Sequence, residues 1–226
     1  MSKRTITGDP PGGAERIRKA AITLFRERGY HGTSVRDLAR AVQMETASLY
    51  YHYPSKQDIL IDLFNRIMED MIVGVEQAVA AATGAEQRLR AAVRFHVGFH
   101  VARQDEAFIS HSELRALSEE PLGRVILQRD RYEKFLRALL SAGVKEGCFE
   151  IADVGVTAAA ILMMCSGVSD WFQRRGRLSG SSIAERYADL VVRMVASPGI
   201  SGMARSKGPV TARKAPVGRQ AVAARH

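Results

Sequence analysis

Apolar side chains recur three and four positions apart along most of this chain. That spacing places them on one face of an α-helix. Helices are expected over 14–28, 34–42, 45–51, 55–80, 85–101, 106–117, 121–145, 154–174 and 182–195. No stretch alternates apolar and polar residues as a half-buried strand would. The sequence therefore predicts an all-α protein of about nine helices.

Residues that start and stop helices divide the first part of the chain into short elements. Ser34 precedes Asp37 by three positions, which approximates a capping box at a helix start. Ser55 and Asp58 repeat the pattern, and Gly29 is a natural helix end. Two short helices joined by a tight turn are therefore expected within about 34–53. This layout is typical of a helix-turn-helix, whose second helix enters the DNA major groove.

The apolar positions of this region decide which side chains stay exposed. The inward set is expected to be Ile17, Leu24, Phe25, Val35, Leu38, Leu49 and Tyr53. The residues left facing outward on the second short helix are Thr46, Ala47, Ser48, Tyr51 and His52. Hydroxyl groups can bind phosphates or base edges, and an alanine can contact a thymine methyl. The side chains suited to phosphate contacts are Tyr50, Tyr51 and Lys56, and Arg36 can reach a phosphate or a base.

These residues together resemble a known family over about residues 14–70, the N-terminal domain of TetR-type transcriptional regulators. The shared pattern is Ala20-Ala21, Leu24-Phe25, Gly29-Tyr30, Thr33, Val35-Arg36-Asp37-Leu38-Ala39, Leu49-Tyr50, His52-Tyr53 and Ser55-Lys56. The resemblance implies an all-α homodimer with a DNA-binding head and a ligand-binding body. The DNA contacts that it implies come from Ser34, Thr46, Ala47, Ser48, Tyr50, Tyr51, His52 and Lys56.

Two positions depart from the family's pattern. Gln43 occupies the turn where the family usually has glycine, and Glu45 stands where Ser or Thr usually begins the second short helix. A residue other than glycine at positive φ costs roughly 1 kcal/mol, which a packed turn tolerates. Glu45 favours the positive end of a helix but would repel a nearby phosphate.

Charge is unevenly distributed along the 226 residues. The net charge is +9, of which 1–58 contribute +4 and 198–226 contribute +6, whereas 59–197 carry −1. Basic ends point toward polyanionic partners.

The expected division is a flexible arm over 1–13, a DNA-binding domain over 14–70, a ligand-binding and dimerisation domain over 71–197, and a disordered basic tail over 198–226. The tail either attracts DNA phosphates or only aids solubility.

The helix over 154–168 is apolar on nearly every side, which is typical of a helix buried on two sides. One side is expected to face the core and the other a second subunit, where it would pair with the final helix. Two helices from each chain would then form a four-helix interface. The residues expected in this interface are Ala158, Leu162, Cys165, Leu190 and Met194. The alternative is a core helix of a monomer.

A ligand pocket needs apolar walls and a few polar anchors. The residues chosen for it are Phe95, Phe99, Arg103, His111, Met163 and Trp171. The body also resembles TetR-type regulators that respond to acyl-CoA thioesters, through its length, Asp170-Trp171-Phe172 and the turn at 147–149. A small aromatic or other lipophilic effector remains an alternative. His96 and His100 have a metal-ligand spacing, but the sequence fixes no third ligand, so no metal and no cofactor are expected.

The predicted function is a ligand-responsive transcriptional repressor that leaves a palindromic operator when a lipophilic effector binds. An alternative keeps the DNA-binding head and gives the body a protein partner. The chain lacks the motifs GxSxG and HExxH and a phosphate-binding glycine loop, so no enzyme is expected. The N-terminus lacks the apolar core of a signal peptide, and the best apolar run is too short to span a membrane. A cytoplasmic, nucleoid-associated protein is therefore expected.

Overall fold

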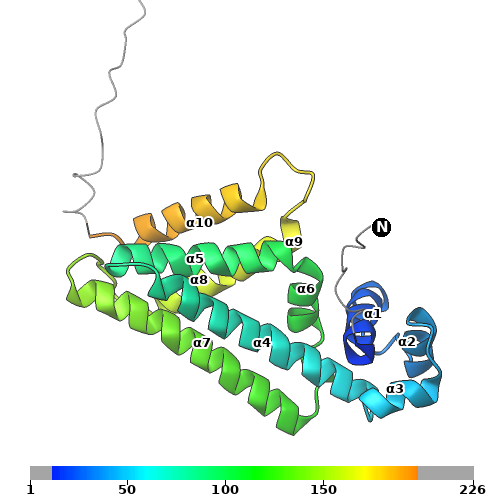
Figure 1. The fold of residues 1–226 in the computed structure, drawn as a ribbon. Helices are drawn as coiled ribbons and strands as arrows, with labels where there is room; N and C mark the ends of the chain where they lie inside the picture. Colours follow the sequence, from blue (N-terminus) through cyan, green and yellow to red (C-terminus); the bar gives the residue numbers. More distant parts are fainter. Residues whose placement is uncertain (1–11, 198–226) are drawn as a thin grey trace, which may run out of the picture.

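The fold is all-α, as the sequence predicts. The computed structural model describes residues 12–197, and within that range the only extended pairing is an isolated bridge between Phe149 and Ala196. Ten α-helices and one 3-10 turn follow one another (Figure 1). They are α1 Gly13–Arg28, α2 Val35–Ala41, α3 Thr46–His52, α4 Lys56–Ala80, α5 Ala85–Ala102, α6 Gln104–Ser112, η1 Leu114–Ala116, α7 Glu119–Lys145, α8 Val154–Ser166, α9 Val168–Trp171 and α10 Gly180–Val195.

The two predicted capping signals begin helices at the expected residues. The Ser34 hydroxyl accepts from the Asp37 amide, and the Asp37 carboxylate accepts from the Ser34 amide, which completes the capping box of α2. The Ser55 hydroxyl accepts from the Asp58 amide at the start of α4. Gly29 ends α1 with a φ of 73°, a conformation that glycine adopts without strain. Local hydrogen bonding thus fixes the boundaries of the short elements.

Three helix predictions need correction. The arm predicted over 1–13 is one residue shorter, because Gly13 begins α1. Residues 1–11 of the arm and the tail, 198–226, lie outside the described residues. The helix expected over 106–117 is α6 followed by the 3-10 turn.

The helix expected over 154–174 is interrupted at Gly167, because glycine weakens a helix interior, and this break raises the helix count from nine to ten. It ends at Trp171, where the Gln104 amide donates to the carbonyls of Ser169 and Phe172. These bonds satisfy carbonyls that a helix end leaves without partners.

The helices pack around three groups of buried apolar side chains. One group joins α1, α2, α3 and the first half of α4, and takes in Ile109, Leu117 and Val125 from the region of α6 and α7. A second joins α5, α7, α8 and α10, and a third joins the second half of α4 to α5 and α7. The helix α4 therefore belongs both to the small three-helix head and to the larger body (Figure 1).

A second connection between head and body runs through α6. The guanidinium of Arg26 on α1 lies 3.9 Å from the ring centroid of Phe108, and its Nε lies 3.5 Å from a carboxylate oxygen of Asp105. These contacts couple the position of α6 to that of α1 as well as to the body.

The turn between α2 and α3 offers a test of local strain. Gln43 is the only residue other than glycine with a positive φ in the range 12–197, at 54°. We expect Gln43→Gly to raise the free energy of unfolding by up to about 1 kcal/mol, because glycine adopts this conformation freely. Chemical denaturation measures the change.

The matched control is Gln87→Gly on the exposed side of α5. It should lower the free energy of unfolding by about 1 kcal/mol, since glycine weakens a helix interior. A destabilising Gln43→Gly would show that the turn gains more from the glutamine side chain than it loses in backbone strain.

Candidate functional site

The helix α3 is displayed on the surface of the head. Leu49 is fully buried beneath it and Tyr53 nearly so, whereas the Tyr51 side chain is 87% exposed. Ala47, Ser48 and Tyr50 are also exposed, and Thr46 and His52 are half-buried. Of the outward set predicted from the apolar spacing, Ala47, Ser48 and Tyr51 are thus exposed and the other two residues are partly so. Contact of these residues with DNA remains a prediction.

A partly buried polar cluster joins Tyr53, at the end of α3, to α1 and α4. The Tyr53 hydroxyl donates to Asp62 over 2.7 Å, and Arg18 and Arg66 donate to the same carboxylate over 3.1 and 2.9 Å. Burial alone would raise the pKa of Asp62, but these hydrogen bonds and the two guanidinium charges outweigh it and lower the pKa. Burial, followed by the bond to Asp62, raises the pKa of Tyr53 to about 12, so the phenol stays protonated as a donor.

Three further residues predicted to contact DNA lie beside α3. Arg36 is exposed on α2. Lys56 donates from Nζ to the carbonyls of Tyr30 and Thr33, both over 2.8 Å, and lies 4.1 Å from the Tyr30 ring centroid. The Ser34 hydroxyl is engaged with Asp37 in the capping box. The polar groups of Lys56 and Ser34 thus already bind protein groups, so a contact with phosphate would add to these hydrogen bonds or replace them.

The body contains a cavity of about 200 Å³ between α4, α5, α6, α7 and α8. Its apolar wall is formed by Ile67, Met68, Met71 and Leu162. Its polar lining is formed by His96, His100, Ser110, His111, Arg129, Tyr132, Glu133 and Ser166. An apolar wall facing a few convergent polar groups is the usual make-up of a small-molecule site.

Three histidine rings stack along this cavity. The ring centroids of His96 and His100 are 4.4 Å apart, and those of His100 and His111 are 6.0 Å apart. His96 lies within hydrogen-bond distance of the hydroxyls of Tyr132 (3.1 Å) and Ser166 (3.0 Å). Burial lowers the pKa of all three imidazoles, that of His100 to about 4. The three rings are therefore neutral at pH 7.

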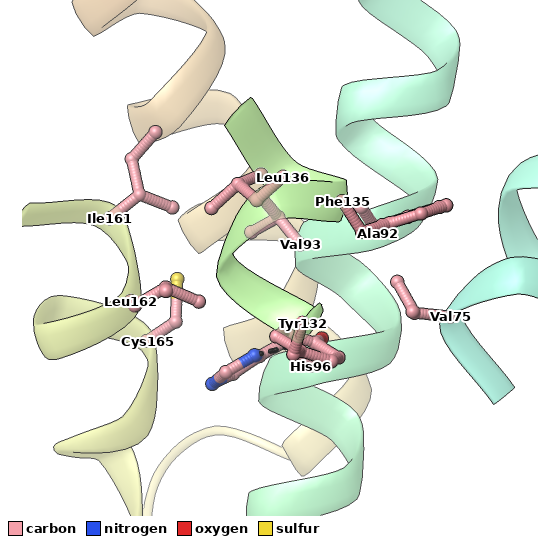
Figure 2. A pocket seen from close by; sticks show the side chains of 10 residues that line it. All are labelled: Val75, Ala92, Val93, His96, Tyr132, Phe135, Leu136, Ile161, Leu162 and Cys165. Carbon is pink, nitrogen blue, oxygen red and sulfur yellow. Dashed lines mark hydrogen bonds between the residues drawn. The ribbon is translucent and has the colours of Figure 1, made fainter. Parts of the chain in front are cut away.

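Two further spaces adjoin the cavity. An outer hollow of about 540 Å³ shares His111, Leu162 and Ser166 with it and opens toward Met163 and Asp170. On the inner side, a recess of about 10 Å³ lies beyond the bonded pair His96 and Tyr132 (Figure 2). Apolar side chains from α4, α5, α7 and α8 nearly fill this recess. Space for a ligand therefore continues outward from the cavity.

The structure places the predicted pocket residues in several locations. His111 lines the cavity and Met163 lines the outer hollow. Phe95 and Phe99 instead pack into the core between α4, α5 and α7. Arg103 pairs with Asp70 and Glu106, and Trp171 stacks on Tyr187 at a centroid distance of 6.4 Å. We therefore revise the pocket: Phe95, Phe99 and Arg103 are taken up by packing or pairing elsewhere, and Trp171 lines a separate hollow of about 230 Å³.

Sequence reasoning missed Arg129, Tyr132 and the methionines of α4. The sequence gives little indication of them, because each lies on an amphipathic helix, where such a residue is ordinarily a surface or core residue. The spacing of His96 and His100 suits metal ligands, but both ring nitrogens of His96 and Nδ1 of His100 lie within hydrogen-bond distance of protein groups. Over residues 12–197 no three side chains of His, Cys, Asp or Glu gather as a metal site would require.

The predicted dimer surface needs a similar revision. Ala158 and Cys165 are buried in this chain's own core, so they face α5 and α7 and not a partner. The opposite side of α8 exposes Val156 and Met163, and α10 exposes half of the Leu190 and Met194 side chains. Leu162 lies between, partly buried beside the cavity. The helices α8 and α10, which both pack on α5, thus each present large apolar side chains to solvent.

The exposed apolar side of α8 belongs to a stretch whose composition resembles that of a membrane-spanning helix. Val154–Trp171 is long and apolar enough to cross a membrane by length and composition alone, with a mean hydropathy of 1.4. In the structure Gly167 interrupts it and one side packs on α5 and α7. A lone stretch of this kind is weak evidence for a membrane, and a surface that a second protein covers has the same composition.

Comparison with known proteins relates the head and the body of this chain to one protein family. The model for bacterial regulatory proteins of the tetR family matches residues 17–63, and the model for the tetracyclin repressor-like C-terminal domain matches residues 82–195. The HTH-type transcriptional repressor KstR2 of Rhodococcus jostii (strain RHA1) is 26% identical over 181 residues, which cover 79% of this chain and 88% of the relative.

Two solved structures have a similar fold. A bacterial regulatory protein in the tetR family from Rhodococcus RHA1 is 29% identical with a TM-score of 0.77, and the match covers 83% of this chain and 98% of that one. AibR in complex with isovaleryl coenzyme A and operator DNA is 28% identical with a TM-score of 0.71, covering 80% and 96%. Since the C-terminal family model alone covers half of the chain and the N-terminal model covers the helix-turn-helix, the chain belongs to the TetR family of bacterial DNA-binding transcriptional regulators.

Proposed function

We propose that this protein is a homodimeric repressor that releases its operator when a lipophilic effector occupies the cavity between α4 and α8. The observation that carries the proposal is the position of that cavity, which is lined by α4 and α6, the two helices that hold the head. The similarity to KstR2, a transcriptional repressor, and to AibR, solved with isovaleryl coenzyme A and operator DNA, supports the same assignment. The cytoplasmic nucleoid is the proposed place of action.

The exposed apolar side of α8 and α10 is the proposed dimer interface. Two copies meeting there around a two-fold axis would form a four-helix contact and bury the exposed side chains of Val156, Leu190 and Met194, leaving the hollow beside Met163 for the effector. Each dimer would then present two copies of α3, one for each half of a palindromic site. The residues proposed to contact DNA are Ser34, Arg36, Thr46, Ala47, Ser48, Tyr50, Tyr51, His52 and Lys56.

The proposed mechanism is a shift in the population of two head positions. A ligand that contacts Ile67, Met68 and Met71 touches α4 directly, and one that contacts His111 touches α6. Both helices pack against the head, so a small change in either alters the spacing of the two α3 helices. A coupling of about 1–3 kcal/mol corresponds to a five- to 150-fold loss of operator affinity.

For the effector we propose an acyl group in the cavity, with a coenzyme A portion extending into the outer hollow. The cavity of about 200 Å³ is smaller than a site for a drug-sized ligand, and the hollow beside it supplies the room that a larger carrier needs. A lining that combines an apolar wall with a few convergent polar groups also favours a small-molecule effector over a protein partner.

The test is a titration of operator affinity with effector. An operator fragment selected from random DNA is bound to the protein, and medium-chain acyl-CoA thioesters and free acids are added. We expect at least one series to weaken operator binding by about five- to 150-fold. If affinity for the operator is unchanged while ligand binding is saturated, the cavity does not control DNA binding and the proposal fails.

A further inference from the structure

Arg129 differs from the other arginines of α7. Arg124, Arg131 and Arg137 each pair with a carboxylate, namely those of Glu120, Glu76 and Glu133. Arg129 points into the cavity, and within the described part of the chain no carboxylate lies within 4 Å of it. Its hydrogen bond runs from Nη2 to the backbone carbonyl of Ser110, over 2.6 Å.

The charge on Arg129 is therefore partly desolvated without a counter-ion. Burial lowers the pKa of its guanidinium, yet an arginine stays protonated in proteins. Glu133, which also lines the cavity, is paired with Arg137 at 2.5 Å. Because the three histidines are neutral, Arg129 is the one uncompensated charge that residues 12–197 contribute to the lining. Such a charge is costly unless a partner of opposite sign binds it.

The rest of the cavity limits the size and shape of that partner. At about 30 Å³ for each water-sized group, 200 Å³ holds roughly seven groups. The wall formed by Ile67, Met68, Met71 and Leu162 offers no hydrogen bonds and suits a short hydrocarbon chain. A guanidinium presents N–H groups in a fork that matches the two oxygens of a carboxylate.

From this arrangement we infer that the effector places a carboxylate in the cavity, bound by Arg129, with a short apolar chain against α4. This inference rests on the proposed function, since it names the chemistry of the same site. The carboxylate belongs either to a free acid or to the far end of a dicarboxylic acyl-CoA. It would compete for the guanidinium that now holds the Ser110 carbonyl on α6, the helix that packs on α1.

Binding measured by calorimetry with two matched ligand pairs tests the inference. The first pair is hexanoate and hexanamide, and the second is adipyl-CoA and hexanoyl-CoA, which differ only in a terminal carboxylate. In the wild-type protein the carboxylate ligand of one pair should bind about 10- to 100-fold more tightly than its neutral partner. The pair that shows the preference distinguishes a free acid from a dicarboxylic thioester.

The variants separate the charge of Arg129 from its effect on folding. Arg129→Gln should abolish the preference, and Arg129→Lys should keep part of it because the positive charge remains. The control Arg124→Gln, at an exposed position of the same helix, should keep all of it. Circular dichroism verifies that each variant is folded.

Equal affinities within both pairs, a preference that survives Arg129→Gln, or no binding by any of the four ligands would overturn the inference. The proposed function fails on a different result, a saturating ligand that leaves operator affinity unchanged. If hexanoyl-CoA releases the operator and neither pair shows a preference, the repressor proposal stands and the carboxylate inference is wrong.

Discussion

Leu190→Glu is expected to convert the dimer into monomers and to lower operator affinity at least about 100-fold. Leu190 is half exposed on α10, one helical turn from the equally exposed Met194, in the interface proposed above. A glutamate there would lose its hydration in the interface without a partner, at a cost of several kcal/mol. A separated head also loses the gain of about 100-fold or more that a second, linked head provides.

Sedimentation and operator titration of the same sample measure both effects. The matched control is Leu127→Glu on α7, which changes a side chain that is 68% exposed, away from α8 and α10. It should leave the oligomeric state and operator affinity as they are. A Leu190→Glu protein that remains a dimer would place the interface elsewhere.

The second large effect on operator affinity is expected from replacing Ser48 and Tyr51 together. Replacing both by alanine should lower operator affinity by about 1000-fold, because each contact with a base or phosphate is worth roughly 1–3 kcal/mol and each head contributes both. Both side chains are exposed and neither supports the head core, so stability should stay within about 0.5 kcal/mol of wild type.

The comparison variant for this loss is Thr23→Ala with Leu127→Ala, two exposed side chains outside α3. Gel-shift titrations on one operator fragment compare the two double variants. A loss of less than about threefold for the Ser48 and Tyr51 variant would mean that another surface reads the DNA.

The head could be predicted from the sequence because its signals are local. Ser34 with Asp37 and Ser55 with Asp58 cap helices within one turn, so neighbouring residues suffice to place them. Leu49 and Tyr53 are four positions apart, which fixes the buried side of α3 and thereby the exposed one. The structure has the same boundaries to within one residue at the start of α3.

The orientation of α8 could not be predicted in the same way. A helix that is apolar on every side has no polar face to mark its exposed surface, so Ala158 and Cys165 were as plausible partner-facing residues as Val156 and Met163. Only the packing of α8 on α5 and α7, which are distant in sequence, decides between the two sides.

Most of the cavity lining could not be predicted, for a related reason. Aromatic residues such as Phe95 and Phe99 suggested walls, but Gly74 leaves room for Phe95 to pack directly against α4. The lining comes from five helices, and Arg129 has the sequence signature of an ordinary surface arginine on α7. Its proposed role depends on the lack of a paired carboxylate among residues 12–197, which only the folded arrangement reveals.

Selection of DNA from a random pool by the purified protein, followed by sequencing, tests the central claim most directly. The account predicts an enriched inverted repeat, with half-sites about one helical turn or a multiple of it apart. It also predicts that the Ser48 and Tyr51 double variant enriches nothing. No enriched sequence with the wild-type protein, or the same repeat recovered by the double variant, would contradict the claim that two copies of α3 read the operator.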